Sequence, residues 1–197
     1  LSPDERAEMK HYSRLADALT PLAKGLGSEY CNQNAYDCIQ IHGGSGFMKD
    51  YACERLYRDA RITSIYEGTT QLQVVAAIRY VTTGLYLDMM KGYAANGFGG
   101  VLEPMAAQLA AMTEKYAAAV AKVTEANNQA YLDFMARRLV EMAGYIIMGY
   151  LLLESAKVNE AFVKTATVYT KIIQAEVARH TDFIDNFTID QLAAYGI

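Results

Sequence analysis

The sequence is short of the residues that mark several classes of protein. It has no tryptophan, three cysteines and three histidines among its 197 residues. The number of cysteines is odd, and no two of them form a C-x-x-C pair; they are Cys31, Cys38 and Cys53. The sequence therefore predicts neither a disulfide framework nor a zinc site. It also lacks a Glu-x-x-His pair, the usual signal for a carboxylate-bridged metal centre in a helical bundle. We therefore expect no metal, and free thiols in a reducing compartment.

An excess of positive charge is lacking too. The formal net charge is −4 and the sequence pI is about 5.4, with the basic residues scattered, so the basic patch of a nucleic-acid binder is missing. The longest apolar run, residues 145–153, is interrupted by Gly149 and is shorter than the roughly 20 residues of a membrane span. The first residues have no basic-then-apolar signal layout. These absences predict a cytoplasmic protein with no nucleic-acid partner and no membrane span.

What the sequence has in abundance is apolar residues that suit helices. Hydrophobic residues make up 52% of the chain, and period-two alternation typical of strands is absent, so we predict an all-α fold of two helical bundles. Residues 2–5, Ser-Pro-Asp-Glu, have the pattern of a capping box and predict a helix over about residues 3–19. Thr20 and Pro21 repeat this start signal and predict a second helix over residues 21–42.

The same signals place the remaining helices. They are expected at about residues 52–59, 70–91, 101–127, 129–156 and 159–180. The glycine-rich residues 92–100 are predicted to be a linker, because glycine is costly inside a helix. The sequence thus predicts a first helical domain at residues 1–91, incomplete at its N-terminus, and a C-terminal helical extension at residues 101–197.

Residues 40–47, Gln-Ile-His-Gly-Gly-Ser-Gly-Phe, place three glycines directly behind a long helix. Gly43 and Gly44 suit a C-cap in the left-handed region, which is the simplest interpretation. A dinucleotide fingerprint is excluded, because no strand precedes the glycines. Bare glycine amides can also approach a phosphate closely, so a pyrophosphate-bearing ligand stays open as a second interpretation.

A second loop, Ile-Tyr-Glu-Gly-Thr-Thr at residues 65–70, precedes another expected helix. One interpretation is structural: Glu67 is an acidic residue near a helix N-terminus, and Thr69 or Thr70 caps that helix. The other is chemical: a carboxylate beside Tyr66 in an apolar loop can abstract a proton from carbon. The loop alone does not decide between the two.

Residues 39–73, IQIHGGSGFMKDYACERLYRDARITSIYEGTTQLQ, resemble the C-terminal helical domain of the acyl-CoA dehydrogenase family. The resemblance rests on three motifs in family order, the Gln-x-x-Gly-Gly-x-Gly-Phe turn, the Arg-Asp-Ala-Arg-Ile helix end and the Tyr-Glu-Gly-Thr loop, and it extends over about residues 20–80. Ser45 and Val74 depart from residues common in the family. Residues 101–197 are similar, more diffusely, to the extra helical domain of the longer bacterial members.

The resemblance implies a function and a site. It implies α,β-dehydrogenation of an acyl-CoA thioester with FAD as cofactor, in which Glu67 is the catalytic base. Gly68 and Tyr66 are then expected beside the substrate. The positions implied to bind FAD are Gln40, Ile41, His42, Gly43, Gly44, Thr69, Thr70 and Gln71.

The resemblance also bears on what surrounds the chain. Family members carry an N-terminal helical domain and a middle β-domain, so it implies that this chain is the C-terminal fragment of a longer enzyme and is inactive alone. The implied partners are acyl-CoA, an electron-transfer flavoprotein and further copies of the chain in a homo-oligomer, a dimer or tetramer. Two alternatives stay open: a fragment of an acyl-CoA oxidase, and a non-catalytic helical interaction or scaffold protein.

Overall fold

The structure is a computed structural model that describes residues 1–197. All of its regular elements are helices, so the predicted all-α fold is confirmed. The chain divides into two compact units, Leu1–Ala77 and Ile78–Ile197. The division falls inside α4 (Thr70–Thr82).

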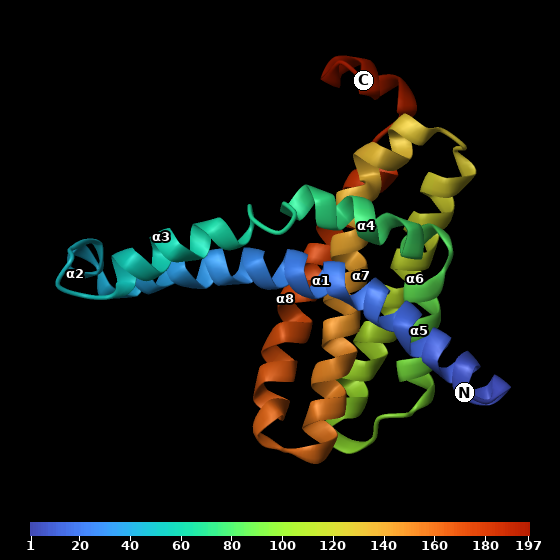
Figure 1. Ribbon diagram of the computed structural model, residues 1–197, viewed down its shortest axis with the longest axis horizontal. Helices are drawn as coiled ribbons and strands as arrows, with labels where there is room; N and C mark the ends of the chain where they lie inside the picture. Colours follow the sequence, from blue (N-terminus) through green and yellow to red (C-terminus); the bar gives the residue numbers. More distant parts are fainter. The chain divides into compact units, whose positions relative to one another are not determined.

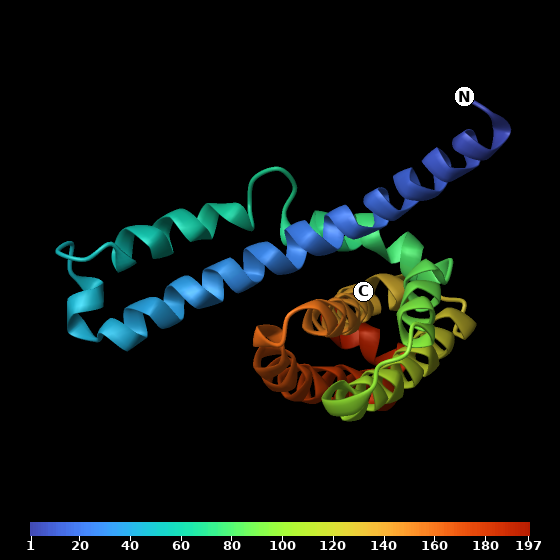
Figure 2. The ribbon, with the colours of Figure 1, turned by 90° about the horizontal axis from the view of Figure 1, so that it is seen from below.

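The first unit is a long helical hairpin. Its elements are α1 (Pro3–His42), α2 (Gly44–Phe47), α3 (Cys53–Thr63) and the beginning of α4. Figures 1 and 2 show α3 running back alongside the second half of α1, with the short α2 in the turn between them. Buried apolar side chains of the hairpin include Leu22, Leu26, Cys53 and Ala60. Apolar burial therefore stabilises both helices of the hairpin.

Helix α1 begins as the sequence predicts. The Ser2 hydroxyl accepts a hydrogen bond from the Glu5 N–H at 3.2 Å, and the Glu5 carboxylate accepts one from the Ser2 N–H at 2.6 Å. This is a complete capping box, which satisfies two of the N–H groups that a helix start leaves without partners.

The prediction of two helices within residues 3–42 is wrong, because α1 runs through Pro21 without a break. The hydroxyl of Thr20 does not cap a new helix but donates to the carbonyl of Ala16 at 2.7 Å, one turn back. Pro21 removes one helical hydrogen bond, a local cost that the burial of Pro21 and Leu22 offsets. A Thr-Pro pair thus marks a helix start only where packing lets the chain turn.

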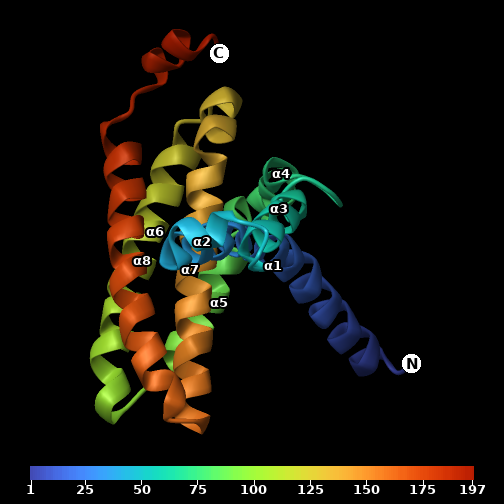
Figure 3. The same ribbon diagram turned by 90° about the vertical axis from the view of Figure 1, so that its left-hand side faces the viewer.

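The second unit is a helical bundle. It contains α5 (Leu85–Ala95), α6 (Glu103–Glu125), α7 (Gln129–Val158) and α8 (Ala161–Asn186), with 3-10 turns η1 (Gly100–Leu102) and η2 (Ile189–Tyr195). Figures 1 and 3 show α6, α7 and α8 side by side, and α7 contacts α5, α6 and α8. The largest fully buried side chains are Tyr86, Met90, Leu109, Tyr116, Met135, Leu139, Met142, Ile146, Ile147, Tyr150, Leu153 and Ile173.

One helix predicted at residues 70–91 is in fact two. Gly84 adopts a φ of 80°, in the left-handed region, and separates α4 from α5. Glycine reaches this conformation without the steric cost of a Cβ atom, so the chain turns there. Helix α5 then continues to Ala95, and residues 96–99 form the irregular connection to η1.

Helix α7 is long and apolar enough, by length and composition, to cross a membrane. The expectation of no such segment rests on the short apolar run at residues 145–153, whereas the whole helix of 30 residues meets the criterion. Within the bundle, 61% of the apolar window of α7 is buried, and the central helix of a helical bundle passes the same test. The burial of Met135, Leu139 and Ile146 at helical spacing explains its apolar character as packing.

Candidate functional site

The loop between α3 and α4 holds the predicted base in a strained backbone. The Tyr66 N–H donates to the Ile62 carbonyl at 3.0 Å, and the Thr70 N–H donates to the Ser64 carbonyl at 3.3 Å. Between these two anchors Glu67 has a φ of 53° and Gly68 a φ of 91°. A non-glycine residue in the left-handed region is uncommon and costs about 1–2 kcal/mol. Such strain persists only where surrounding contacts hold it.

Two side chains supply those contacts. The Lys24 ammonium on α1 donates to the Gly68 carbonyl, with 2.6 Å between Nζ and the oxygen. The Gln73 amide donates to the same carbonyl at 3.3 Å and to the Glu67 carbonyl at 3.4 Å. Sequence reasoning missed both residues. Gln73 is close enough in sequence to be suspected, but nothing in the sequence connects Lys24 with this loop.

Gly68 has a reason within the chain to lack a side chain. A Cβ atom at this position would lie 2.7 Å from Nε2 of Gln73, and the positive φ disfavours any L side chain. The absence of a side chain at Gly68 therefore leaves room for the Gln73 amide, which donates to the carbonyls of Glu67 and Gly68.

Glu67 lies at the surface of the first unit. The residue is exposed, and its N–H makes no hydrogen bond within the chain. Ile65 and Tyr66 beside it are 45% and 49% exposed, so the apolar loop lies at the surface of this unit. The N–H of Glu67 is therefore a donor without a partner in the chain, on the residue that carries the exposed carboxylate.

The start of α4 borders an open pocket of about 500 Å³. Thr69 caps the helix, since its hydroxyl oxygen accepts from the Leu72 N–H at 3.3 Å. The Thr70 hydroxyl donates to the Glu29 carboxylate at 2.6 Å. The residues that line the pocket include Glu29, Asn32, Tyr57, Arg61, Ser64, Thr69, Thr70 and Gln71. The cavity is thus polar and carries charges of both signs.

The three glycines in the turn at the end of α1 differ in why they are glycine. Gly43 ends the helix with a φ of 60°, so it needs the conformational freedom of glycine. Gly46 is buried, and a Cβ atom there would lie 2.7 Å from both the Ile39 carbonyl oxygen and the His42 Cβ. At Gly44 the space is open, with no atom within 4 Å of the position of a Cβ. Neither backbone angle nor packing explains Gly44.

The predicted site residues lie in two separate groups. Gln40, Ile41, His42, Gly43 and Gly44 are all exposed at the tip of the hairpin. Thr69, Thr70 and Gln71 line the pocket at the start of α4, and Tyr66, Glu67 and Gly68 form the loop before them. None of the first group lines that pocket.

Comparison with known families covers nearly the whole chain. A family described as "Acyl-CoA dehydrogenase C terminal" matches residues 82–192, and one described as "Acyl-CoA dehydrogenase, C-terminal domain" matches residues 4–81. A solved structure of an acyl-CoA dehydrogenase family protein from Porphyromonas gingivalis is similar, with a TM-score of 0.55 and 38% identity, over 57% of this chain and 98% of that one. The all-α fold is therefore that of a dehydrogenase C-terminal region. The chain belongs to the acyl-CoA dehydrogenase family.

Individual relatives match between about a quarter and two fifths of this chain. A caffeyl-CoA reductase-Etf complex subunit from Acetobacterium woodii is 52% identical over 26% of this chain and 14% of its own length. An acryloyl-CoA reductase (NADH) from Anaerotignum propionicum is 44% identical over 39% and 21%, respectively. A mitochondrial long-chain specific acyl-CoA dehydrogenase from Sus scrofa is 42% identical over 35% and 16%. The matched stretch is thus a small part of each of these relatives.

Proposed function

We propose that this chain is the C-terminal part of an FAD-dependent acyl-CoA dehydrogenase, and that Glu67 is its catalytic base. The observation that carries the proposal is the left-handed backbone of the exposed Glu67, whose N–H makes no hydrogen bond within the chain. Strain of this kind at a non-glycine residue is typical of functional sites. The family relationship supplies the chemical context.

The chain's own groups have defined tasks in this proposal. The Glu67 carboxylate takes the α-proton of the acyl-CoA thioester. The Glu67 N–H donates to the thioester oxygen, where negative charge develops as that proton leaves. Lys24 and Gln73 keep the loop in place by holding the two carbonyls at Glu67 and Gly68. Tyr66 and Gly68 flank the base and border the substrate.

Bound FAD would supply the acceptor for the hydride of the β-carbon. The exposed backbone at Gly43 and Gly44, with nothing within 4 Å of a Cβ position, can be approached by the adenosine diphosphate half of the cofactor, and Gln40, Ile41 and His42 adjoin it. The pocket at the start of α4 offers the Thr69 and Thr70 hydroxyls and the Gln71 amide. Because these three side chains offer uncharged donors and acceptors, we assign the pocket to the flavin part of the cofactor.

The partners follow from the relatives and from the surface. One relative is named as a subunit of an Etf complex, which favours an electron-transfer flavoprotein as the redox partner. Large apolar side chains are exposed around both groups of site residues, among them Ile41, Phe47, Leu56, Ile65 and Leu72. Exposed apolar surface of this extent marks an interface. We assign it to the rest of the enzyme and to other subunits of a homo-oligomer in the cytoplasm.

The reaction has two directions, and relatives are named for both. Two of those described above are named reductases and one a dehydrogenase. The same carboxylate that removes the α-proton returns it when an enoyl-CoA is reduced, because both directions share one transition state. Glu67 is therefore required in either direction.

The test is Glu67→Gln in the complete gene product. Dehydrogenation of acyl-CoA and reduction of enoyl-CoA should both fall by at least about 100-fold, since a positioned base typically contributes that much. The bound flavin, measured by its visible absorbance, should be unchanged. Glu8→Gln, at an exposed position on α1, is the matched control and should keep full activity. Turnover of Glu67→Gln close to that of the unmodified enzyme would refute the assignment.

A further inference from the structure

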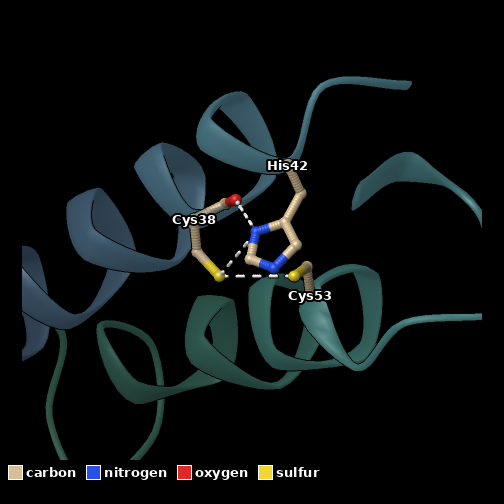
Figure 4. Close-up of side chains that lie close together, drawn as sticks. All are labelled: Cys38, His42 and Cys53. Carbon is tan, nitrogen blue, oxygen red and sulfur yellow. Dashed lines mark hydrogen bonds between the residues drawn. The ribbon is translucent and has the colours of Figure 1, made fainter. Parts of the chain in front are cut away.

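The fold brings together three side chains that take no part in the proposed proton transfer. Cys38 and His42 lie one helical turn apart near the end of α1, and Cys53 is the first residue of α3. The two sulfur atoms and one ring nitrogen of His42 all lie within 4.8 Å of one another. Figure 4 shows the imidazole between the two sulfur atoms. The spacing C-x-x-x-H followed by a distant cysteine is not a familiar zinc pattern, so the sequence alone gave no reason to expect a metal.

From this geometry we infer that Cys38, His42 and Cys53 form a binding site for a thiophilic divalent metal ion such as Zn²⁺. Two thiolates and one imidazole are a usual three-ligand set for zinc. Ordinary Zn–S and Zn–N bonds of about 2.3 and 2.0 Å place tetrahedral ligands about 3.4–3.8 Å apart. The Cys38 and Cys53 sulfur atoms are already 3.3 Å apart, so only small side-chain rotations are needed.

The imidazole is oriented as a metal ligand. Nδ1 of His42 lies 2.8 Å from the carbonyl oxygen of Cys38. A carbonyl can only accept, so Nδ1 carries the proton in this bond and Nε2 keeps its lone pair for a metal. A hydrogen bond from the second ring nitrogen to a backbone carbonyl is the usual support for a metal-binding histidine.

The surroundings suit an ion that enters from solvent. Cys53 is buried, with 4% of its surface exposed, Cys38 is half-buried and His42 is exposed. The buried thiolate is shielded from competing water, and the exposed imidazole leaves one side of the ion open for a water molecule as the fourth ligand. The ion would join the end of α1 to the start of α3 and so fix the intervening turn, residues 43–52.

Binding has a definite proton balance. Each thiol loses its proton when its sulfur binds, so one M²⁺ ion displaces two protons and no electrons are transferred. The hydrogen bond shared by the two thiols, together with burial, raises the pKa of the Cys53 thiol. Because protons compete with the metal for both sulfur atoms, its affinity should increase with pH.

The test is a titration of the reduced, metal-free 197-residue chain with Co²⁺, followed by displacement with Zn²⁺. One equivalent should produce a sulfur-to-cobalt charge-transfer band and release two protons near neutral pH. Cys31→Ser removes the third cysteine, which lies outside the cluster, and should leave the band unchanged. Cys38→Ser and Cys53→Ser should each weaken binding at least 10-fold and lower the band. His42→Gln should weaken binding by a similar factor while the band retains both sulfurs.

Circular dichroism measures the helix content and so tests whether each variant is folded. If Cys53→Ser does not fold, Cys53→Ala replaces it. No charge-transfer band in a folded chain whose three thiols all react as free would overturn the inference. So would equal binding by Cys38→Ser, or loss of the band in Cys31→Ser. Spontaneous oxidation of Cys38 and Cys53 to a disulfide in preference to metal binding, seen as a mass loss of two hydrogens, would also overturn it.

Discussion

The side chain of Lys24 donates a hydrogen bond to the carbonyl of Gly68, with 2.6 Å between nitrogen and oxygen. The two residues are 44 positions apart in the chain. This bond fixes the carbonyl of the residue that follows Glu67, and the Lys24 ammonium also lies 5.9 Å from the centre of the Tyr66 ring. The middle of α1 therefore positions the loop that carries the proposed base.

Replacing Lys24 by methionine should loosen this loop. The apolar stem is kept, but the charged donor is lost, and the Gly68 carbonyl retains only the weaker bond from Gln73. We expect the free energy of unfolding to fall by about 1 kcal/mol. A hydrogen bond from a charged donor contributes about 1–3 kcal/mol, and the Gly68 carbonyl still accepts from Gln73. Urea unfolding measures this change.

A local measurement separates loop opening from a general loss of stability. Glu67 lies in the exposed loop, so a glutamate-specific protease should cut after it faster in Lys24→Met than in the unmodified chain. Lys10→Met changes an exposed lysine of the same helix and is the control. Equal cleavage rates after Glu67 in the two variants would show that Lys24 does not hold the loop.

The bundle of the second unit depends on Gly149. A Cβ atom at this position of α7 would lie 2.5 Å from Cδ2 of Leu109 on α6 and 3.3 Å from Cδ1 of Ile173 on α8. Leu109 and Ile173 are fully buried and have little room to move. Gly149→Ala should therefore lower the free energy of unfolding by about 1–3 kcal/mol, as overpacking typically does.

Gly92 provides the opposite case. It lies inside α5, is exposed, and has no atom within 4 Å of a Cβ position. Gly92→Ala should stabilise the chain by up to about 1 kcal/mol, because alanine favours the helix. The two variants are compared by urea unfolding. If both stabilise the chain equally, close packing at Gly149 is not what requires glycine there.

The sequence predicts elements well where the signal is local, and less well where packing decides. The capping box at residues 2–5 was found because all its partners lie within four residues. The Thr20-Pro21 pair was misread, because burial of the surrounding helix outweighs one lost hydrogen bond. The break at Gly84 was missed, since a glycine inside an apolar periodic run does not reveal its φ.

The site shows the same limit. The Tyr-Glu-Gly-Thr loop is recognisable from four adjacent residues, and its helix cap at Thr69 is confirmed. Lys24 and Glu29 could not be assigned to it, because their contacts with Gly68 and Thr70 depend on how α1 packs beside the start of α4. Cys38, His42 and Cys53 meet only because the hairpin folds back at Gly43.

The carboxylate of Glu141 on α7 accepts hydrogen bonds from an arginine and a histidine. The Oε2 atom of Glu141 lies 3.1 Å from Nε2 of the buried His180 on α8, and Oε1 accepts from Arg137 at 2.8 Å. Burial by itself acts to raise the pKa of Glu141, but the hydrogen bonds from His180 and Arg137 and the charge of Arg137 outweigh it, so the pKa is lowered.

This lowered pKa gives the bundle a predictable acid sensitivity. The pKa of a glutamate in an unfolded chain is about 4.3, and the pKa of Glu141 in the folded chain is lower. Its contribution to stability is therefore complete above that value and is lost as pH falls through the folded pKa. Glu141→Gln should lower the free energy of unfolding by about 1–3 kcal/mol at pH 7, and the difference from the unmodified chain should shrink as the pH falls below about 4.

The control for this prediction is Glu176→Gln, which breaks an exposed pair with Arg179 on the surface of α8. Because exposed pairs contribute at most about 1 kcal/mol, its effect at pH 7 should be small. Urea unfolding of the unmodified chain, Glu141→Gln and Glu176→Gln is measured between pH 3 and 7, in steps of about half a unit. Subtracting each variant from the unmodified chain gives the stability difference as a function of pH. A Glu141→Gln difference that stays constant over this range would mean that the side chain stabilises the bundle by packing and not by its charge.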